Sequence, residues 1–239
     1  MLKDNRIGCA GWSIDRQSVA HFPGDGSHLQ RYASILNAAE INSSFYKPHQ
    51  ASTYARWADS VPENFRFSVK LPRTISHYQK LADVDDLLER FASEAGSLGH
   101  KLGCVLVQLP PSLTLSLEVA DDFFIRLRTS FGCMIACEAR HGSWFADDAT
   151  ELLRRHHVTR VIADPPAGQP GAFVPTTDRI YARLHGSPRI YYSPYSDDYL
   201  DQVAAYLKEH DGWCIFDNTA SGAALPNALT LMEKLKPTE

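Results

Sequence analysis

Polar residues that can do chemistry recur at one kind of position in this 239-residue sequence, at or just after the end of a short apolar run. The carboxyl groups of Glu40, Glu138 and Asp164 and the imidazole of His185 are groups that proteins use to move protons. An unpaired charge in an apolar run is costly, so one shared polar cluster explains these positions economically. We therefore predict these four as catalytic residues, with His185 first among them.

A second set of residues near the same positions carries groups that bind anions or stack on planar ligands. Arginine forks match carboxylate and phosphate oxygens, lysine is a compact positive charge, and aromatic rings can form the walls of a site. The predicted ligand-binding residues are Trp12, Asn42, Lys70, Gln108, Arg140, His141, Trp144, Arg183, Tyr192, Tyr195, Asp217 and Asn218. Together they predict an anion-binding site for a small polar or phosphorylated ligand.

A divalent metal site is an alternative use of the same carboxylates. Glu138, Asp164, His185 and Asp217 end four consecutive apolar runs, and such a mixed set suits Mg²⁺, Mn²⁺ or Zn²⁺. Nearby arginines can neutralise these carboxylates without a metal, and the sequence has no His-x-His or His-Glu-x-x-His spacing. We predict no metal ligand and no cofactor, and keep a metal-dependent hydrolase or isomerase as an alternative function.

Two further interpretations stay open. The pairs Glu138–Arg140 and Asp217–Arg183 can be structural ion pairs, and aromatic residues such as Trp144 can pack loops against the fold. The protein can also be a non-catalytic binding module for an anionic ligand or a nucleic acid, although nucleic acid is not the favoured partner.

The elements that must position these residues follow from the hydrophobic pattern. Short runs rich in β-branched and apolar residues alternate with segments of helical period. The eight expected strands cover residues 6–12, 38–42, 65–70, 104–109, 134–138, 160–164, 180–185 and 213–217. Alternation of this kind implies a parallel sheet with right-handed crossovers, and a chain near ~250 residues favours a closed (β/α)₈ TIM barrel. Ligands of such barrels bind at the carboxyl ends of the strands, where the polar residues lie.

Helical spacing fills the gaps between the strands. The expected helices run over 29–37, 52–60, from 83 to 96 or 99, from 116 through 127, from 147 or 148 through 156, from 197 or 198 through 207, and over about 226–235. Only the link between the sixth and seventh strands, around residues 168–172, lacks a helix. No linker divides the chain, so we expect a single domain over residues 1–239. An open doubly wound sheet is the rival architecture, but it would usually carry a glycine-rich phosphate loop after its first strand, which is absent.

Composition excludes several classes of protein. The chain has 24 Lys and Arg against 28 Asp and Glu, a net charge of −4, with 44% hydrophobic residues. That balance is too apolar for disorder, and no run approaches the ~18 apolar residues of a membrane span. The polar first residues give no sign of a signal peptide, so we expect a cytoplasmic protein. The absence of a Gly-x-Ser-x-Gly elbow, a Walker loop and a dinucleotide fingerprint argues against serine hydrolase, NTPase and nicotinamide-dependent activities.

The sequence resembles the YecE-like family, a family of unknown function, along nearly its whole length. The matching segments include IGCAGW (7–12), EINSSFY (40–46), FRFSVKLP (65–72), QLPP (108–111), EARH (138–141), YARLHG (181–186) and FDN (216–218). Departures are mild: Ser44 stands where threonine is common, and Asp217-Asn218 stands where paired asparagines often occur. The resemblance implies a TIM-barrel fold with a site at the strand ends, and it implies no established reaction.

Overall fold

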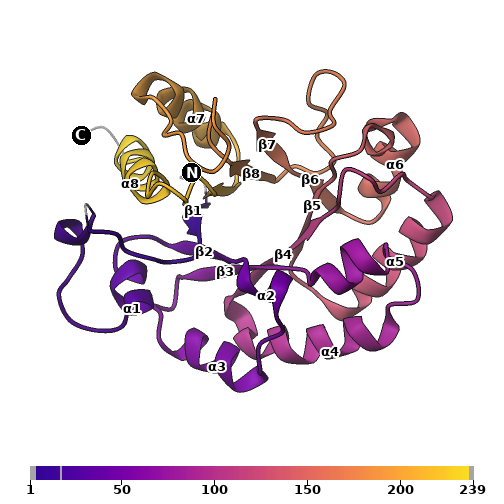
Figure 1. Ribbon diagram of the computed structural model, residues 1–239, viewed down its shortest axis with the longest axis horizontal. Helices are drawn as coiled ribbons and strands as arrows, with labels where there is room; N and C mark the ends of the chain where they lie inside the picture. Colours follow the sequence, from indigo (N-terminus) through magenta and orange to yellow (C-terminus); the bar gives the residue numbers. More distant parts are fainter. Residues whose placement is uncertain (1–3, 17, 237–239) are drawn as a thin grey trace.

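A nearly closed barrel of parallel strands is surrounded by helices in the computed structural model, which describes residues 4–16 and 18–236 (Figure 1). The strands are β1 (Asn5–Ala10), β2 (Ala38–Ile41), β3 (Arg66–Lys70), β4 (Leu102–Gln108), β5 (Met134–Glu138), β6 (Val158–Arg160), β7 (Ile162–Asp164), β8 (Ile180–Leu184) and β9 (Gly212–Phe216). They pair in the order β6-β5-β4-β3-β2-β1-β9-β8-β7. The predicted barrel fold is confirmed.

The sixth barrel strand differs from its predicted form. We expected one strand over residues 160–164, but the chain forms β6 from Val158 and β7 from Ile162, with Val161 between them. β6 pairs with β5, and β7 pairs with β8. The two short strands therefore take the place of one barrel strand, because each serves a different neighbour.

Helices occupy the predicted gaps. The outer helices are α1 (His28–Ala33), α3 (Ala51–Asp59), α4 (Asp85–Ala95), α5 (Leu117–Ser130), α6 (Asp147–Arg155), α7 (Asp197–Glu209) and α8 (Ala224–Lys234). Shorter helical segments outside the predicted helices are η1 (Val19–His21), α2 (Ser43–Tyr46), η2 (Thr74–Tyr78) and η4 (Gly142–Phe145), whereas η3 (Gly96–Lys101) directly follows α4 and overlaps the predicted end of that helix at residue 96 or 99. No helix stands between β7 and β8, as predicted, and a loop spans this gap (Figure 1). Within the described residues, no helix has the length and apolar content needed to cross a membrane.

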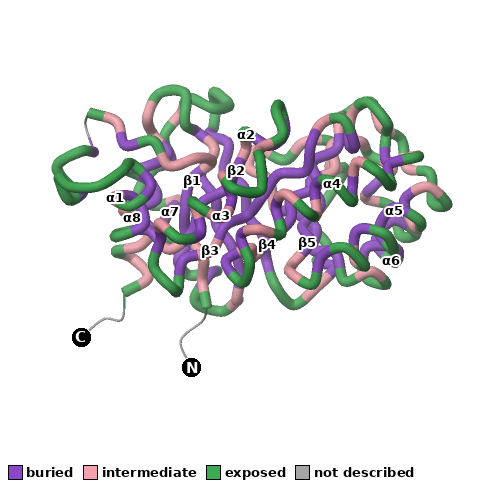
Figure 2. The backbone as a smooth tube through the Cα atoms, turned by 90° about the horizontal axis from the view of Figure 1, so that it is seen from below, coloured by how far each residue is buried: buried purple, intermediate pink, exposed green. Residues whose placement is uncertain are grey.

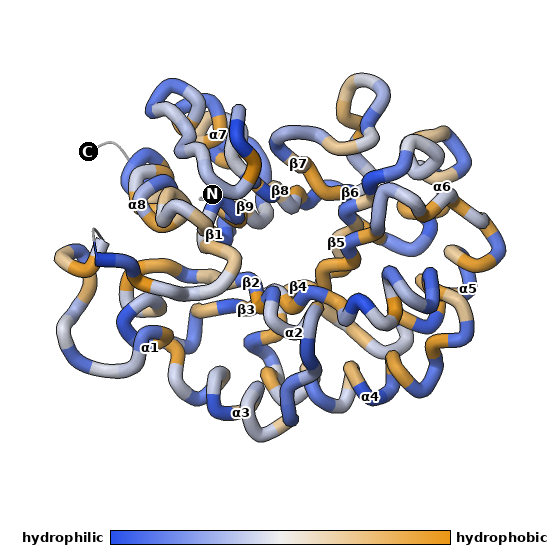
Figure 3. Tube along the Cα trace, in the orientation of Figure 1, coloured by the Kyte–Doolittle hydropathy of each residue, from blue (hydrophilic) through white to orange (hydrophobic). Residues whose placement is uncertain are grey.

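Side chains alternate between two cores along each strand, since successive residues of a strand point to opposite faces. A large core lies between the strands and the outer helices, so burial follows the strands and the inner helix faces (Figure 2). A smaller apolar cluster, which we assign to the barrel interior, contains Ala38, Cys104, Leu106, Ala136, Val161, Tyr181, Trp213 and Ile215. Apolar stretches along the strands accordingly stand out on the hydropathy-coloured trace (Figure 3). Residues separated by two positions on a strand point to the same face, so residues two positions from a member of the smaller cluster also point inward, and we call this the inward parity. Polar side chains of inward parity at the strand ends can therefore contact one another next to this cluster.

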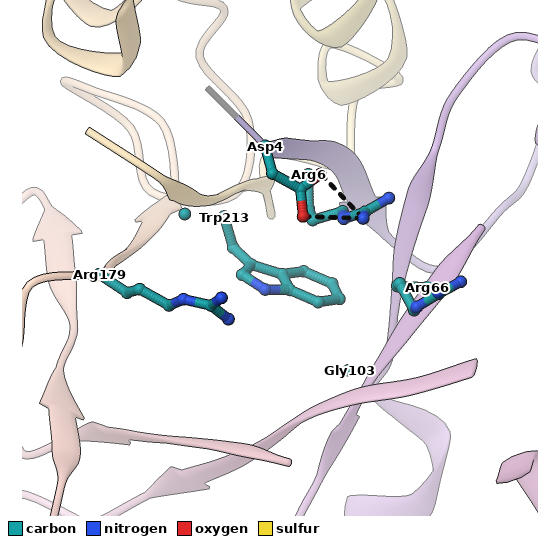
Figure 4. Close-up of a pocket in the computed structure, with 7 residues that line it drawn as sticks. Asp4, Arg6, Arg66, Gly103, Arg179 and Trp213 are labelled. Carbon is teal, nitrogen blue, oxygen red and sulfur yellow. Dashed lines mark hydrogen bonds and ion pairs between the residues drawn. The ribbon is translucent and has the colours of Figure 1, made fainter. Parts of the chain in front are cut away.

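Trp213 closes the amino-terminal end of the barrel. Its ring stacks on Tyr181, with ring centroids 5.8 Å apart, and a Cβ atom on Gly103 would lie only 2.6 Å from it. The cavity beside it has a volume of about 100 Å³ and is lined by Asp4, Arg6, Arg66, Gly103, Arg179, Gly212 and Trp213 (Figure 4). Arg6 and Arg66 donate to backbone carbonyls of residues 63–65, so they fix the loop before β3. This end of a barrel ordinarily serves stability.

Candidate active site at the barrel mouth

Polar residues continue the inward parity of the strands at their carboxyl ends, which we call the mouth. Each lies two positions beyond a residue of the inner cluster: Glu40 after Ala38, Gln108 after Leu106, Glu138 after Ala136, Arg183 after Tyr181, and Asp217 after Ile215. His185 follows Arg183 by two positions, and Lys70 follows the buried Ser68 by two. The carboxyl ends of parallel strands lie at the same end of the barrel, so the sequence places these polar residues together at the mouth, beyond the apolar residues of the interior.

Arg183 is the centre of this layer and is completely buried. Its Nε and Nη2 donate to the two oxygens of Glu40 at 3.0 and 2.7 Å, in a bidentate pair. Nη2 also donates to Asp217 Oδ2 at 2.9 Å, and Nη1 donates to Glu138 Oε2. One guanidinium therefore binds three carboxylates, and we call these four side chains with His185 the central cluster.

Tyr181 joins the central cluster to the apolar layer below it. Its hydroxyl lies 2.8 Å from Glu40 Oε2 and 2.7 Å from Ser68 Oγ, and all three residues are buried. Glu40 is thereby held by Arg183 and Tyr181 at the bottom of the mouth. We did not single out Tyr181 or Ser68 from the sequence, although both share the parity of the predicted residues and that parity is a usable signal.

Glu138 receives hydrogen bonds from the mouth side as well. Arg140 Nε and Nη2 donate to Glu138 Oε1 at 2.9 and 2.7 Å, and Gln108 Nε2 donates to the same oxygen at 3.2 Å. Burial alone would raise the pKa of this carboxyl, but Arg183, His185 and Arg140 outweigh burial and hold it well below the ordinary value. Glu138 is therefore an ionised carboxylate near neutral pH.

The two ring nitrogens of His185 face different carboxylates, and only Nδ1 is within hydrogen-bond distance of its carboxylate. Nδ1 lies 3.0 Å from Asp217 Oδ2, whereas the buried Nε2 is 3.4 Å from Glu138 Oε1 and makes no hydrogen bond within the described residues. Burial lowers the pKa of His185, but Asp217 and Glu138 outweigh burial and raise it above the ordinary value. The Asp217 pKa is correspondingly lowered, with Arg183 and His185 outweighing the effect of burial.

Lys70 ends β3 with an ammonium group that makes no hydrogen bond or ion pair within the described part of the chain. Nζ lies 4.3 Å from the centroid of the Phe45 ring, and the Lys70 carbonyl accepts a hydrogen bond of 2.6 Å from Ser44 Oγ. Burial first, and the positive charge of Arg183 second, lower the pKa of Lys70 to about 8. The side chain is thus a buried amine close to its titration point.

The loop that follows β8 brings a tyrosine to the mouth. The Tyr191 ring meets the His185 ring edge-on at 5.8 Å, and its amide donates to the His185 carbonyl at 2.6 Å. Tyr191 adopts a φ of +70°, which is uncommon for a residue with a side chain, and it also lies beside Arg140. We did not include it among the predicted site residues, because nothing in the tyrosine-rich loop sequence separates it from Tyr192.

Asp164 is not brought into the central cluster. It follows the inward-facing Ala163 by one position, so its side chain takes the opposite parity and faces α7. Burial and the nearby Asp164 carboxylate raise the pKa of Tyr199 on that helix. Asp164 Oδ2 is buried without a hydrogen bond among the described residues.

Several predicted ligand-binding residues instead hold loops in place. Trp144 is 1% exposed and donates from Nε1 to the Leu113 carbonyl at 2.9 Å. The Tyr195 hydroxyl joins the Asp164 carbonyl and the Gly186 amide, and Asn218 Nδ2 donates to the Ser193 carbonyl. The structure gives these three side chains partners within the fold.

The remaining predicted residues lie nearer the rim or pack beside it. Trp12 packs edge-on against Trp57 at 5.1 Å. His141 caps η4, since its Nδ1 accepts from the Ser143 amide at 3.2 Å. Tyr192 is 41% exposed and stacks with Arg189, whereas Asn42 Oδ1 is buried without a hydrogen bond among the described residues.

Metal coordination was the alternative use of the carboxylates. Among residues 4–16 and 18–236, no group of three or more His, Cys, Asp and Glu side chains is arranged to hold a metal ion. The oxygens of Glu40, Glu138 and Asp217 that face the barrel axis are occupied by Arg183.

Sequence comparisons identify relatives of this chain. The family model described as "Protein of unknown function DUF72" matches residues 6–239. The chain is 31% identical over 142 residues to "UPF0759 protein YecE" of Escherichia coli (strain K12), a match that covers 57% of this chain and spans about half (52%) of that protein. It is 25% identical over 269 residues to "UPF0759 protein YunF" of Bacillus subtilis (strain 168), covering 96% of this chain and 94% of that one.

Solved structures show the same fold. A DUF72 family protein of Thermotoga maritima MSB8 superposes with a TM-score of 0.80 at 25% identity, covering 98% of this chain and all of the other. One from Enterococcus faecalis V583 gives a TM-score of 0.80 at 22% identity, covering 98% of this chain and 96% of the other. The match of the family model over nearly the whole sequence is decisive, and the chain belongs to the DUF72 family of proteins of unknown function.

Proposed function

We propose that this protein is an enzyme that acts by acid–base chemistry on a small anionic ligand at the barrel mouth. His185 is the group that moves the proton, and Asp217 is its positioning residue. Glu138 keeps the imidazole charged. The predicted cytoplasmic location and a phosphorylated ligand are compatible with this proposal and stay predictions.

The hydrogen bonding of His185 carries the proposal. A histidine that binds a carboxylate through Nδ1 has its ring orientation and tautomer fixed, and Nε2 is left to exchange a proton with a ligand. Within the described residues the buried Nε2 makes no hydrogen bond and has Glu138 Oε1 at 3.4 Å, although buried polar atoms usually have a hydrogen-bond partner. Because Asp217 and Glu138 raise the His185 pKa, the imidazolium is available as a proton donor near neutral pH.

Charge at the mouth favours an anionic ligand. The three carboxylates of the central cluster are matched by Arg183, Arg140 and the imidazolium of His185. The Lys70 ammonium is then a positive charge in excess, in a place where an unpaired charge is costly. A carboxylate or phosphate ligand would offset it, and Arg140 is one-quarter exposed and can donate to the same ligand.

The test combines binding with turnover. Small phosphate monoesters and carboxylates are screened by thermal shift, and those that bind are assayed for conversion with wild-type protein, H185Q and H210Q. His210 is the matched control, because its half-buried ring stacks on Tyr206 away from the mouth. We expect H185Q to abolish turnover while the protein still unfolds in a cooperative thermal transition, which shows that it is folded. Full turnover in H185Q, or no binding by any anion, would contradict the proposal.

A further inference from the structure

Two lysines of this chain are buried to the same extent but differ in the hydrogen bonding of their amino groups. Lys70 and Lys101 are each 7% exposed. Lys101 donates from Nζ to the carbonyls of Ala58 and Val61 at 2.8 and 2.7 Å, which satisfies the charged group. Nζ of Lys70 lies against the face of Phe45 and makes no hydrogen bond or ion pair within the described residues, although the carboxylates of Glu40, Glu138 and Asp217 are near enough to act on its charge. Lys101 is therefore a structural lysine, whereas the fold leaves the Lys70 amine without a partner.

The surroundings of Lys70 favour the neutral amine. An amine becomes a nucleophile when it is desolvated or placed near another cation, since both conditions disfavour the protonated form. Lys70 meets both, because it is buried against an aromatic ring and feels the charge of Arg183. Its pKa of about 8 leaves an appreciable fraction of the amine neutral at physiological pH.

We propose that Lys70 is a catalytic nucleophile that forms a Schiff base with the carbonyl carbon of a small anionic substrate. The inference rests on the acid–base function proposed for the mouth and names its substrate class, a carbonyl compound that also carries a carboxylate or phosphate. Lys70 lies near enough to Asp217 for its charge to lower the Asp217 pKa, and Asp217 binds His185. The amine and the proton donor thus serve the same mouth.

Schiff-base formation begins when the nitrogen lone pair of neutral Lys70 forms a bond to the carbonyl carbon, the carbonyl oxygen gains a proton, and the nitrogen loses one. The hydroxyl group of the resulting carbinolamine leaves as water with a proton from His185, while the C–N bond becomes an iminium. One water molecule is released, and no oxidant or reductant is consumed.

Reductive trapping tests the inference without knowledge of the natural substrate. Full-length protein is incubated with glyoxylate and cyanoborohydride, which supplies the hydride that fixes an iminium as a secondary amine. Adducts are then located by intact-mass and peptide mass spectrometry. Acetaldehyde replaces glyoxylate in a second arm, because it keeps the carbonyl and lacks the anion. We expect a single adduct on Lys70, none on Lys101, and slower trapping of acetaldehyde.

Variants and pH distinguish two roles of Lys70, nucleophilic attack by the neutral amine and anion binding by the positive charge. K70M and K70R should trap nothing at residue 70, while K70R, which keeps the charge, should still bind anions reversibly. Trapping should fall about 50-fold from pH 8 to pH 6, since a group with a pKa near 8 is half neutral at the first pH and about 1% neutral at the second.

The outcomes distinguish the two proposals. Adducts spread over exposed lysines with no preference for Lys70, or equal trapping in K70M, would overturn the Schiff base. Reversible anion binding with no trapping would also overturn it and leave the acid–base proposal standing. Absence of both binding and trapping would overturn both.

Discussion

Arg183 and Glu40 form a bidentate ion pair in which both side chains are completely shielded from solvent. The two residues are 143 positions apart in the sequence and lie on β8 and β2. A buried charge is tolerated only when it is paired and hydrogen-bonded, and both conditions are met here. The pair is therefore a constraint on barrel closure as well as the floor of the mouth.

Removal of one partner of this pair should destabilise the fold strongly. We expect E40A to lower the free energy of unfolding by about 3–5 kcal/mol, because a buried guanidinium loses two charge-assisted hydrogen bonds. E63A is the control: the Glu63 carboxylate is largely exposed beside His100, so its loss should cost at most ~1 kcal/mol. Urea denaturation measures both. An E40A variant as stable as E63A would show that the pair contributes little to the fold.

The double variant E40M/R183M should not recover wild-type stability. An isolated buried pair can often be replaced by apolar residues, but removal of Arg183 also leaves Glu138 and Asp217 without their shared cation. We expect the double variant to be less stable than E40A in the same urea series. Recovery of wild-type stability would mean that the pair acts independently of the other two carboxylates.

Asp217 should control the pKa of His185, and Asp164 should not. In D217N a neutral amide replaces the charged acceptor that raises the His185 pKa, while burial persists, so the His185 pKa should fall in an NMR titration. D164N makes the same chemical change at the end of β7, which also neighbours β8 but presents Asp164 on its outward face, and it should leave the His185 pKa unchanged. Equal shifts in both variants would contradict the orientation of Asp164.

The raised His185 pKa also gives stability a defined pH dependence. The folded pKa lies above the unfolded value of about 6.5, so the stabilisation is complete below that pH and is lost as the pH rises through the folded pKa. The stability difference between wild type and D217N should therefore shrink as the pH rises from 6 towards 8. A difference that grows over this range would show that the His185 pKa is lowered instead.

Lys70 should reduce the stability of the fold, as expected for a residue kept for function. The pKa of Lys70 is about 8 in the folded protein and 10.5 in the unfolded chain. At neutral pH, folding therefore buries a charged amine, which lowers the free energy of unfolding. We expect K70M to raise the free energy of unfolding at pH 7 by on the order of 1–3 kcal/mol. This advantage should shrink between pH 8 and pH 10.5.

The matched variant K101M should behave in the opposite way. Its loss leaves the Ala58 and Val61 carbonyls without their donor, so we expect destabilisation by about 1–3 kcal/mol at pH 7. Thermal and urea unfolding at several pH values measure both lysines. A destabilised K70M variant would show that Lys70 has a partner that stabilises its charge.

The barrel and the inward polar residues could be predicted because both follow from local pattern. Apolar runs at regular spacing define the strands, and a polar residue that ends such a run marks the mouth. Side-chain alternation within a strand also predicts orientation. Val161 and Ala163 both point inward, so the side chain of Asp164 points outward. Position at a strand end alone, without this parity, groups Asp164 with Glu138 and His185.

The rest of the site depends on contacts that sequence pattern does not encode. Trp144 and Tyr195 are aromatic residues in mouth loops, but their polar atoms are bound to backbone groups that are distant in the sequence. Arg183 binds three carboxylates at once because three different strands present them towards the barrel interior at the mouth. Whether a lysine has a partner depends on such tertiary contacts, so the difference between Lys70 and Lys101 is visible only in the structure.

The amino-terminal end of the barrel offers a last test of how the interior is filled. A methyl group on Gly103 would meet Trp213 at 2.6 Å and the Arg66 Cβ at 3.2 Å (Figure 4). Because Trp213 is stacked on Tyr181, the indole cannot withdraw without disturbing the ring that supports Glu40. We expect G103A to cost about 1–3 kcal/mol in unfolding free energy, by overpacking. G103A/W213F, with a smaller ring, should recover part of that loss relative to W213F alone, whereas additive losses in the double variant would mean that the strain lies elsewhere.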